Sequence, residues 1–113
     1  MEIFDYLNRG GKNVILDYIC NLDKRSRDKI IFIRNAIELY GIDAFENINY
    51  RKLVDKIYEI KVYNSRFAYT IINNKLYFLH AFKKQKNKTE QKDISTSLSR
   101  YDEIKNKEVL CRL

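Results

Sequence analysis

The fold is decided by residues 58–82, which read YEIKVYNSRFAYTIINNKLYFLHAF. From Tyr58 to Val62 apolar and polar side chains alternate, and residues 67–72 and 76–82 are rich in aromatic and β-branched side chains, as β-strands are. Turns separate these runs at Asn64-Ser65 and at Asn73-Asn74, and asparagine accepts the positive φ that tight turns need. The sequence therefore predicts an antiparallel meander of three strands.

The first half of the chain has helical periodicity instead. A short helix is predicted after Gly10-Gly11 from the spacing of the apolar residues between positions 14 and 19. A second helix begins near Asp23 or Ser26, either of which can cap it, and ends at Gly41. Its buried face is predicted to consist of Ile30, Ile33, Ile37 and Tyr40, which follow one another at spacings of three and four.

The two ends of the chain complete the expected architecture. Residues 3–7 are short and apolar enough for an edge strand, and an amphipathic helix is expected from Thr89 onward. The predicted order is β-α-α-β-β-β-α. We therefore expect an α+β fold in which helices pack on one face of a twisted antiparallel sheet, a three-stranded meander plus the N-terminal edge strand, and leave the other face free.

Length and composition favour one domain over residues 1–113. The chain is 45% apolar and 33% charged, which is enough apolar material for a packed core and argues against disorder. The chain contains no run of about 18 apolar residues, the length that a membrane span needs, and its first ten residues lack the pattern of a signal peptide. The cytosol is therefore the expected compartment. Cys20, Cys111 and the single His80 do not have zinc-site spacing, and both thiols are expected to stay reduced.

The net charge of +7 is concentrated in one stretch of the chain. Residues 51–92 contain eleven basic and three acidic residues, a net charge of +8, so the remaining 71 residues sum to −1. Clustered Lys and Arg attract phosphate and displace counterions, and this favours a nucleic acid as the partner. An acidic protein partner, or a lysine-rich composition without a binding role, is the alternative.

The alternation of the first predicted strand places Lys61 on the opposite face of the sheet from Tyr58, Ile60 and Val62. Arg66 opens the next strand close to it. Side chains that face each other across a hairpin lie about 5 Å apart, and two cations at that separation are unfavourable unless an anion lies between them. We expect this basic pair to bind a phosphate.

The same residues carry a resemblance to the RelE/ParE toxin superfamily, closest to its HigB-like, phage-derived branch. The matching runs are LVDKIYEIKV at residues 53–62, Arg66 with Tyr69, and LHAFKK at residues 79–84. The match is ungapped from Leu53 to Arg100 and extends over the helical first half only by pattern. The chain departs from the family pattern at four positions, with Lys61 in place of Arg, Lys56 of Gly, Gln85 of Lys and Glu90 of Pro.

The resemblance implies a type II toxin that cleaves mRNA in the ribosomal decoding site and is neutralised by a cognate antitoxin. The RNA supplies its own 2′-hydroxyl nucleophile, so the enzyme removes a proton, stabilises the phosphorane and lets the 5′-oxygen leave. No metal or cofactor is expected. The implied partners are the ribosome, mRNA and a HigA-like helix-turn-helix antitoxin, with the toxin as a monomer or in a heteromeric complex.

Site residues follow from this chemistry. Arg66 is assigned to the phosphorane because its planar fork binds two phosphate oxygens, and Lys61 holds the scissile phosphate as a point charge. The predicted catalytic residues are Arg66, Lys61, Lys84 and His80. The predicted RNA-binding residues are Lys52, Lys56, Lys83, Lys86 and Lys88.

Each assignment has a structural alternative. Lys61 and Lys84 would then be solvated lysines, Arg66 a salt-bridge partner of Glu59, and His80 a hydrogen-bonded structural histidine. For the whole protein, two other functions remain open. One is an inactive module that binds RNA or an antitoxin, and the other is a toxin that inhibits DNA gyrase, as the ParE branch does.

Overall fold

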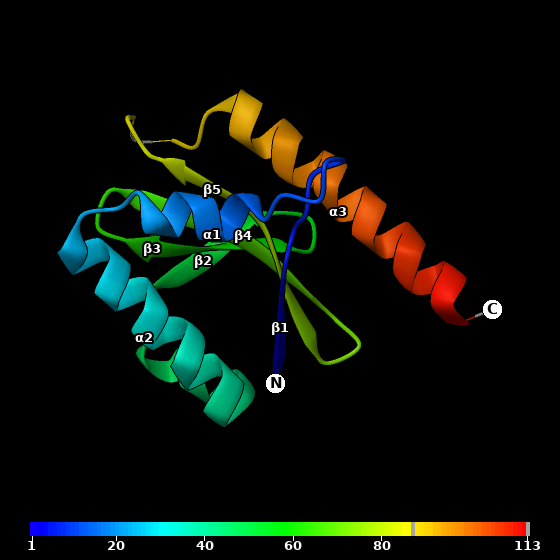
Figure 1. Ribbon diagram of the computed structural model, residues 1–113, viewed down its shortest axis with the longest axis horizontal. Coiled ribbons are helices and arrows are strands. Elements are labelled where there is room, and N and C mark those ends of the chain that lie inside the picture. Colours follow the sequence, from blue (N-terminus) through cyan, green and yellow to red (C-terminus); the bar gives the residue numbers. More distant parts are fainter. Residues whose placement is uncertain (87, 113) are drawn as a thin grey trace.

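The predicted meander is the centre of the sheet in the computed structural model, which describes residues 1–86 and 88–112, with side chains up to Lys107 (Figure 1). The elements, in chain order, are β1 (Glu2–Asp5), α1 (Val14–Cys20), α2 (Lys24–Tyr40), the 3₁₀ segment η1 (Gly41–Asn47), β2 (Tyr50–Val54), β3 (Ile57–Val62), β4 (Ser65–Ile72), β5 (Lys75–Lys83) and α3 (Gln91–Arg112). The α+β class and the order of the predicted elements are confirmed.

The sheet contains five strands in the order β1-β5-β4-β3-β2. The strand β1 lies at one edge, as predicted, and runs parallel to β5, while the other three pairings are antiparallel. The sequence analysis missed β2, which pairs with β3 at the opposite edge and has a partly exposed side-chain pattern. Its side chains contribute little apolar periodicity of their own, so the strand is defined by its partner.

Local signals placed both ends of α2 and the β4–β5 turn correctly. The β3–β4 turn is Tyr63-Asn64 and not the predicted Asn64-Ser65, because Ser65 already pairs with Val62 in the ladder, and α3 begins at Gln91 rather than at Thr89. In α2 the three predicted isoleucines are buried, but Tyr40 in the last turn is 67% exposed, so its place on the buried face was predicted wrongly. The side chain of Asp23 accepts a hydrogen bond from the backbone N–H of Ser26 at 3.2 Å and so caps α2. Gly41 follows the helix with a φ of 61°, and Asn73 and Asn74 have φ values of 53° and 61° in the β4–β5 turn. These backbone conformations favour glycine and asparagine, which explains why those residues mark the boundaries.

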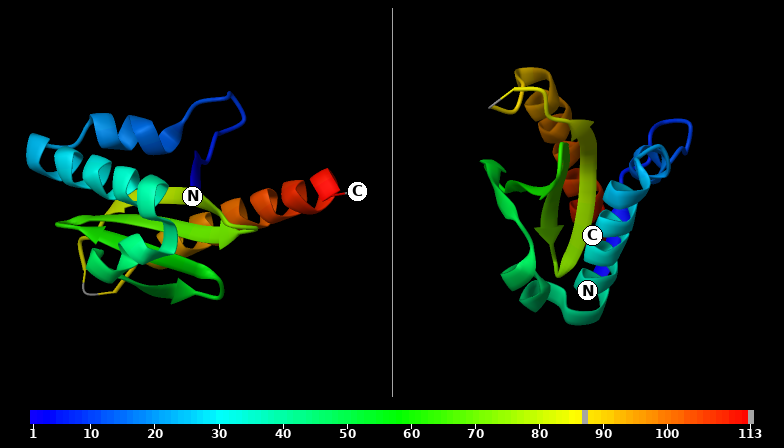
Figure 2. Two further views of the ribbon diagram at one scale, coloured as in Figure 1. Left: turned by 90° about the horizontal axis from the view of Figure 1, so that it is seen from below. Right: turned by 90° about the vertical axis from the view of Figure 1, so that its left-hand side faces the viewer.

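The helices do not share one face of the sheet, and that prediction is wrong. The helices α1 and α2 cover one face of the sheet, which we call the α1–α2 face. Its buried strand residues include Ile60, Val62, Phe67 and Phe78. The last helix, α3, crosses the opposite face, which we call the α3 face (Figure 2). There Ile104 of α3 packs with Ile57, Ala68, Leu79 and Phe82 of the sheet. The apolar residues on this second face need cover, and α3 provides it.

The chain contains two cysteines, Cys20 and Cys111. Cys20 is a free, exposed thiol at the end of α1. Cys111 lies outside the described side chains. Across residues 1–86 and 88–112, no helix is long and apolar enough to cross a membrane.

Candidate functional site

The sheet register places Lys61 directly opposite Arg66 on the α3 face. The two are paired residues in the β3–β4 ladder, while their neighbours Val62 and Phe67 are buried on the α1–α2 face. Lys61 and Arg66 are both partly buried. The predicted pairing of two cations across the hairpin is therefore confirmed.

Arg66 is held at the β3–β4 turn by its own backbone environment. Its Nη1 donates to the carbonyl oxygens of Tyr63 at 2.7 Å and Ser65 at 2.9 Å. Its Nε is buried and has no hydrogen-bond partner among the described residues. Burial lowers the pKa of Arg66, and the positive charge of Arg51 adds to this, while the negative charge of Glu59 opposes it. An unpaired buried N–H is costly, and an anionic oxygen at this position would satisfy it.

Lys84 joins this pair from the end of β5. Its backbone N–H donates to the carbonyl oxygen of Asn64 at 2.8 Å, which ties the segment after β5 to the same turn. Burial lowers the pKa of Lys84, and the positive charges of Arg51, Arg66 and Lys61 lower it further. We call Lys61, Arg66 and Lys84 the basic cluster. A lysine with a lowered pKa spends more time as a neutral amine, which can accept a proton.

A buried carboxylate lies behind the basic cluster. Glu59 is fully buried, and its Oε1 accepts from Nε of Arg51 at 2.5 Å, across the β2–β3 pair. Its Oε2 accepts from the hydroxyl of Thr89 at 3.2 Å, and that hydroxyl also accepts from Nη2 of Arg51 at 3.3 Å. Among the described side chains the ion-pair partner of Glu59 is therefore Arg51 rather than Arg66, which leaves Arg66 available.

The sequence analysis did not identify Arg51 and Glu59 as site residues. Glu59 alternates with apolar residues in the same way as Lys61 and is therefore on the same face, and this signal was available. No such signal identified Arg51 as the partner of Glu59, because Arg51 belongs to β2, a strand that the sequence pattern does not predict.

His80 lies on the α3 face, where α3 holds it in place. Its Nε2 is 2.8 Å from Oδ1 of Asp93, and its Nδ1 is 3.4 Å from Nη1 of Arg100, which also donates to the carbonyl oxygen of Leu79. Burial lowers the pKa of His80, while the hydrogen bond to Asp93 raises it. Both ring nitrogens have partners, as in the structural alternative, and a catalytic role for His80 stays a prediction.

The five predicted RNA-binding lysines lie on several different elements. Lys52 is opposite Tyr58, and Lys56 lines a cavity of about 470 Å³ on the α1–α2 face. Lys83 is opposite Ser65 and lines a separate cavity on that face. Lys86 and Lys88 are exposed in the segment between β5 and α3. The structure thus brings together Lys61, Arg66 and Lys84, whereas the five lysines are distributed over the β2–β3 hairpin, the end of β5 and the segment before α3.

Comparison with known protein families identifies the family of this chain. The family model described as "Phage derived protein Gp49-like (DUF891)" matches residues 17–102, which include α2, η1, the strands β2 to β5 and the basic cluster. No curated protein matches the chain. The match extends over more than half of the sequence, and the chain therefore belongs to the Gp49-like family of phage-derived proteins, a family of RelE/HigB-like toxins.

Proposed function

We propose that this protein is the toxin of a type II toxin–antitoxin system and that it cleaves mRNA on the ribosome. The observation that carries the proposal is the buried Nε of Arg66 beside Lys61 and Lys84, which has no hydrogen-bond partner in residues 1–86 and 88–107. An arginine donor in this environment is suited to an oxygen that gains negative charge during a reaction. Membership of a RelE/HigB-like toxin family supports the same conclusion.

Each member of the basic cluster has one role in the proposed reaction. Lys84, as a neutral amine, takes the proton of the RNA 2′-hydroxyl, and the resulting oxygen attacks the adjacent phosphorus. The guanidinium of Arg66 stabilises the phosphorane, and Lys61 neutralises a non-bridging phosphate oxygen. The bond from phosphorus to the 5′-oxygen then breaks, water protonates the leaving oxygen, and a 2′,3′-cyclic phosphate remains.

The ion pair behind the cluster tunes this chemistry in the proposal. Arg51 and the two other cations lower the pKa of Lys84, whereas Glu59 raises it. Because Glu59 is buried and bound to Arg51, its negative charge stays close to the cluster without occupying the phosphate position. Lys86 and Lys88 follow Lys84 in the sequence and are exposed. We propose that they bind the phosphates that flank the cleaved one.

A partner follows from family membership. Toxins of this kind act with an antitoxin, and the family implies one for this chain. We propose that the antitoxin is a HigA-like helix-turn-helix protein that represses the promoter of the pair. Growth arrest on expression of the chain alone, with rescue by the neighbouring small protein, is the expected result.

Incubation with programmed ribosomes tests the enzymatic proposal. The expected result is mRNA cut in the decoding site with 2′,3′-cyclic phosphate ends and 5′-hydroxyl ends, as transesterification leaves. Ribosome binding without any cut would instead favour the inactive module, and inhibition of DNA supercoiling would favour a gyrase inhibitor. An Arg9→Ala variant, which removes an exposed arginine outside the cluster, is the matched control for Arg66→Ala.

A further inference from the structure

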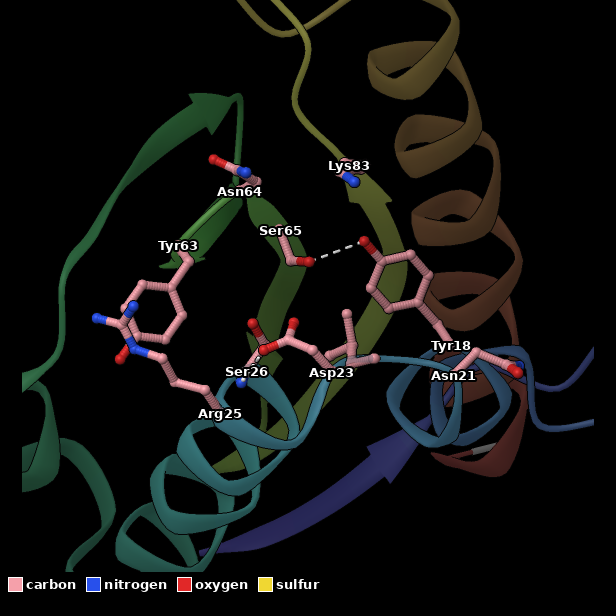
Figure 3. Close-up of a pocket in the computed structure, with 10 residues that line it drawn as sticks. Tyr18, Asn21, Asp23, Arg25, Ser26, Tyr63, Asn64, Ser65 and Lys83 are labelled. Atoms are coloured by element: carbon pink, nitrogen blue, oxygen red, sulfur yellow. Dashed lines mark hydrogen bonds between the residues drawn. The ribbon is translucent and has the colours of Figure 1, made fainter.

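A cavity of about 730 Å³ lies on the other side of the β3–β4 turn from the basic cluster (Figure 3). It is bounded by the junction between α1 and α2 and by the ends of β3, β4 and β5. Its volume is within the range of small-molecule and cofactor sites. The mechanism proposed above does not use it.

One wall of the cavity is a stacked pair of an arginine and a tyrosine. The guanidinium carbon of Arg25 is 3.9 Å from the centre of the Tyr63 ring, and Nζ of Lys29 is 4.6 Å from it. Tyr63 is 41% exposed, and Arg25 forms no ion pair with any described residue. Aromatic rings and guanidinium planes are the surfaces on which unpaired RNA bases stack.

The opposite wall is polar and can recognise the edge of a base. The hydroxyl groups of Tyr18 and Ser65 are 2.8 Å apart, and Figure 3 shows the Ser65 hydroxyl directed toward Tyr18. Asn21, which also lines the cavity, donates its amide nitrogen to the carbonyl oxygen of Asp17 at 2.8 Å. Lys83, at the end of β5, adds an exposed positive charge that suits a phosphate.

The cavity and the basic cluster share the same short piece of backbone. The carbonyl oxygens of Tyr63 and Ser65 hold Arg66 on the α3 face, while the side chains of Tyr63 and Ser65 line the cavity. Lys83 and Lys84 are consecutive, and one lines the cavity while the other belongs to the cluster. A single RNA strand that crosses the end of the hairpin would therefore meet both sites.

From this geometry we infer that the cavity binds one nucleotide of the RNA substrate, next to the phosphate held by the basic cluster. The base stacks on Arg25 and Tyr63, its edge meets Tyr18, Ser65 and Asn21, and the flanking phosphate meets Lys83. The inference rests on the proposed function for the identity of the substrate. In this arrangement the cavity at the α1–α2 junction selects the base, and the basic cluster on the α3 face cleaves the RNA.

The test uses RNA hexamers with 2′-O-methyl groups, which cannot be cleaved, so that binding is measured apart from chemistry. Each position is varied through the four bases, and affinity is measured with the full chain. The pocket variants are Arg25→Ala and Tyr63→Asn, because asparagine accepts the φ of 54° at position 63. The matched controls are Lys24→Ala and Tyr40→Ala, which remove an exposed lysine and an exposed tyrosine that do not line the cavity.

We expect both pocket variants to bind about 5- to 150-fold more weakly, the loss expected for one stacked base, and to lose base preference at one position. The controls and Arg66→Ala should keep that preference. Wild-type affinity and base preference in both pocket variants, with unchanged circular dichroism, would overturn the inference even if the ribosomes are cut normally. Conversely, a wild-type chain that binds with preference but never cuts unmodified mRNA would refute the proposed enzyme and leave the nucleotide site standing.

Discussion

Replacing Arg66 by alanine removes the guanidinium of the basic cluster, which is bonded to the β3–β4 turn. The side chain makes two hydrogen bonds to the carbonyl oxygens of Tyr63 and Ser65, and its Nε has no partner among the described residues. The bond to Tyr63 is exposed and the bond to Ser65 is partly buried, so we assign about 1–3 kcal/mol of folding free energy to the pair. A domain of this kind is stable by about 5–15 kcal/mol, and the variant should stay folded.

The effect on the reaction should be larger than the effect on folding. If Nε contacts charge that develops only in the phosphorane, its loss should slow cleavage by about 10²- to 10³-fold, as expected for one donor to an oxyanion. The affinity for uncleavable RNA should change much less, because the ground-state phosphate still meets Lys61 and Lys84. Thus the expected signature is a slow chemical step with nearly normal binding.

The assay is single-turnover cleavage of mRNA on saturating programmed ribosomes, beside hexamer affinity and thermal unfolding of each variant. Arg66→Lys keeps the charge and removes the planar fork, so its rate should lie between those of Arg66→Ala and the wild type. Cleavage at the wild-type rate by folded Arg66→Ala would refute the reasoning and place the active site elsewhere.

Four further outcomes are expected. Lys61→Arg should speed single-turnover cleavage, because a bidentate fork replaces a point charge; an equal or slower rate would count against a phosphate at that position. RNA affinity measured against salt should fall with a slope of log K near −4, for about six phosphate contacts, and a slope near zero would exclude the basic stretch from the interface. Glu59→Gln removes the charge that raises the pKa of Lys84, so the rising limb of the pH–rate profile should move to lower pH and not to higher pH. Burial lowers the pKa of His80 below its ordinary value of 6.5, so the unfolded state takes up a proton at a higher pH than the folded state does. The free energy of unfolding should therefore decrease as the pH falls below about 6.5. The decrease should be less steep in His80→Asn.

Local sequence signals predicted much of the candidate site. Alternation along β3 placed Lys61 on one face of the sheet, because the side-chain period of a strand is two, and put it near Arg66 at the end of the hairpin. The direct pairing of Lys61 with Arg66 depends on the turn, which lies at Tyr63-Asn64, one residue earlier than predicted. The same reasoning did not identify Arg51, whose strand is recognisable only by its pairing with β3. It could not show the cavity beside Tyr63 either, because the α1–α2 junction and the hairpin turn are far apart in the chain.

The sequence by itself determined which residues share a side of each element. Helical spacing in α2, the asparagine turn between β4 and β5 and the alternation of β3 are all properties of neighbouring residues. The structure confirms them, except that Tyr40 at the end of α2 is exposed. Only the tertiary structure decided what covers each face. Packing of α3 against the second face of the sheet gives His80 two side-chain partners, and pairing of β2 with β3 buries Glu59 against Arg51. These arrangements depend on contacts between residues distant in sequence, whose free energy comes from burial and pairing after the chain has folded, and no local pattern encodes them.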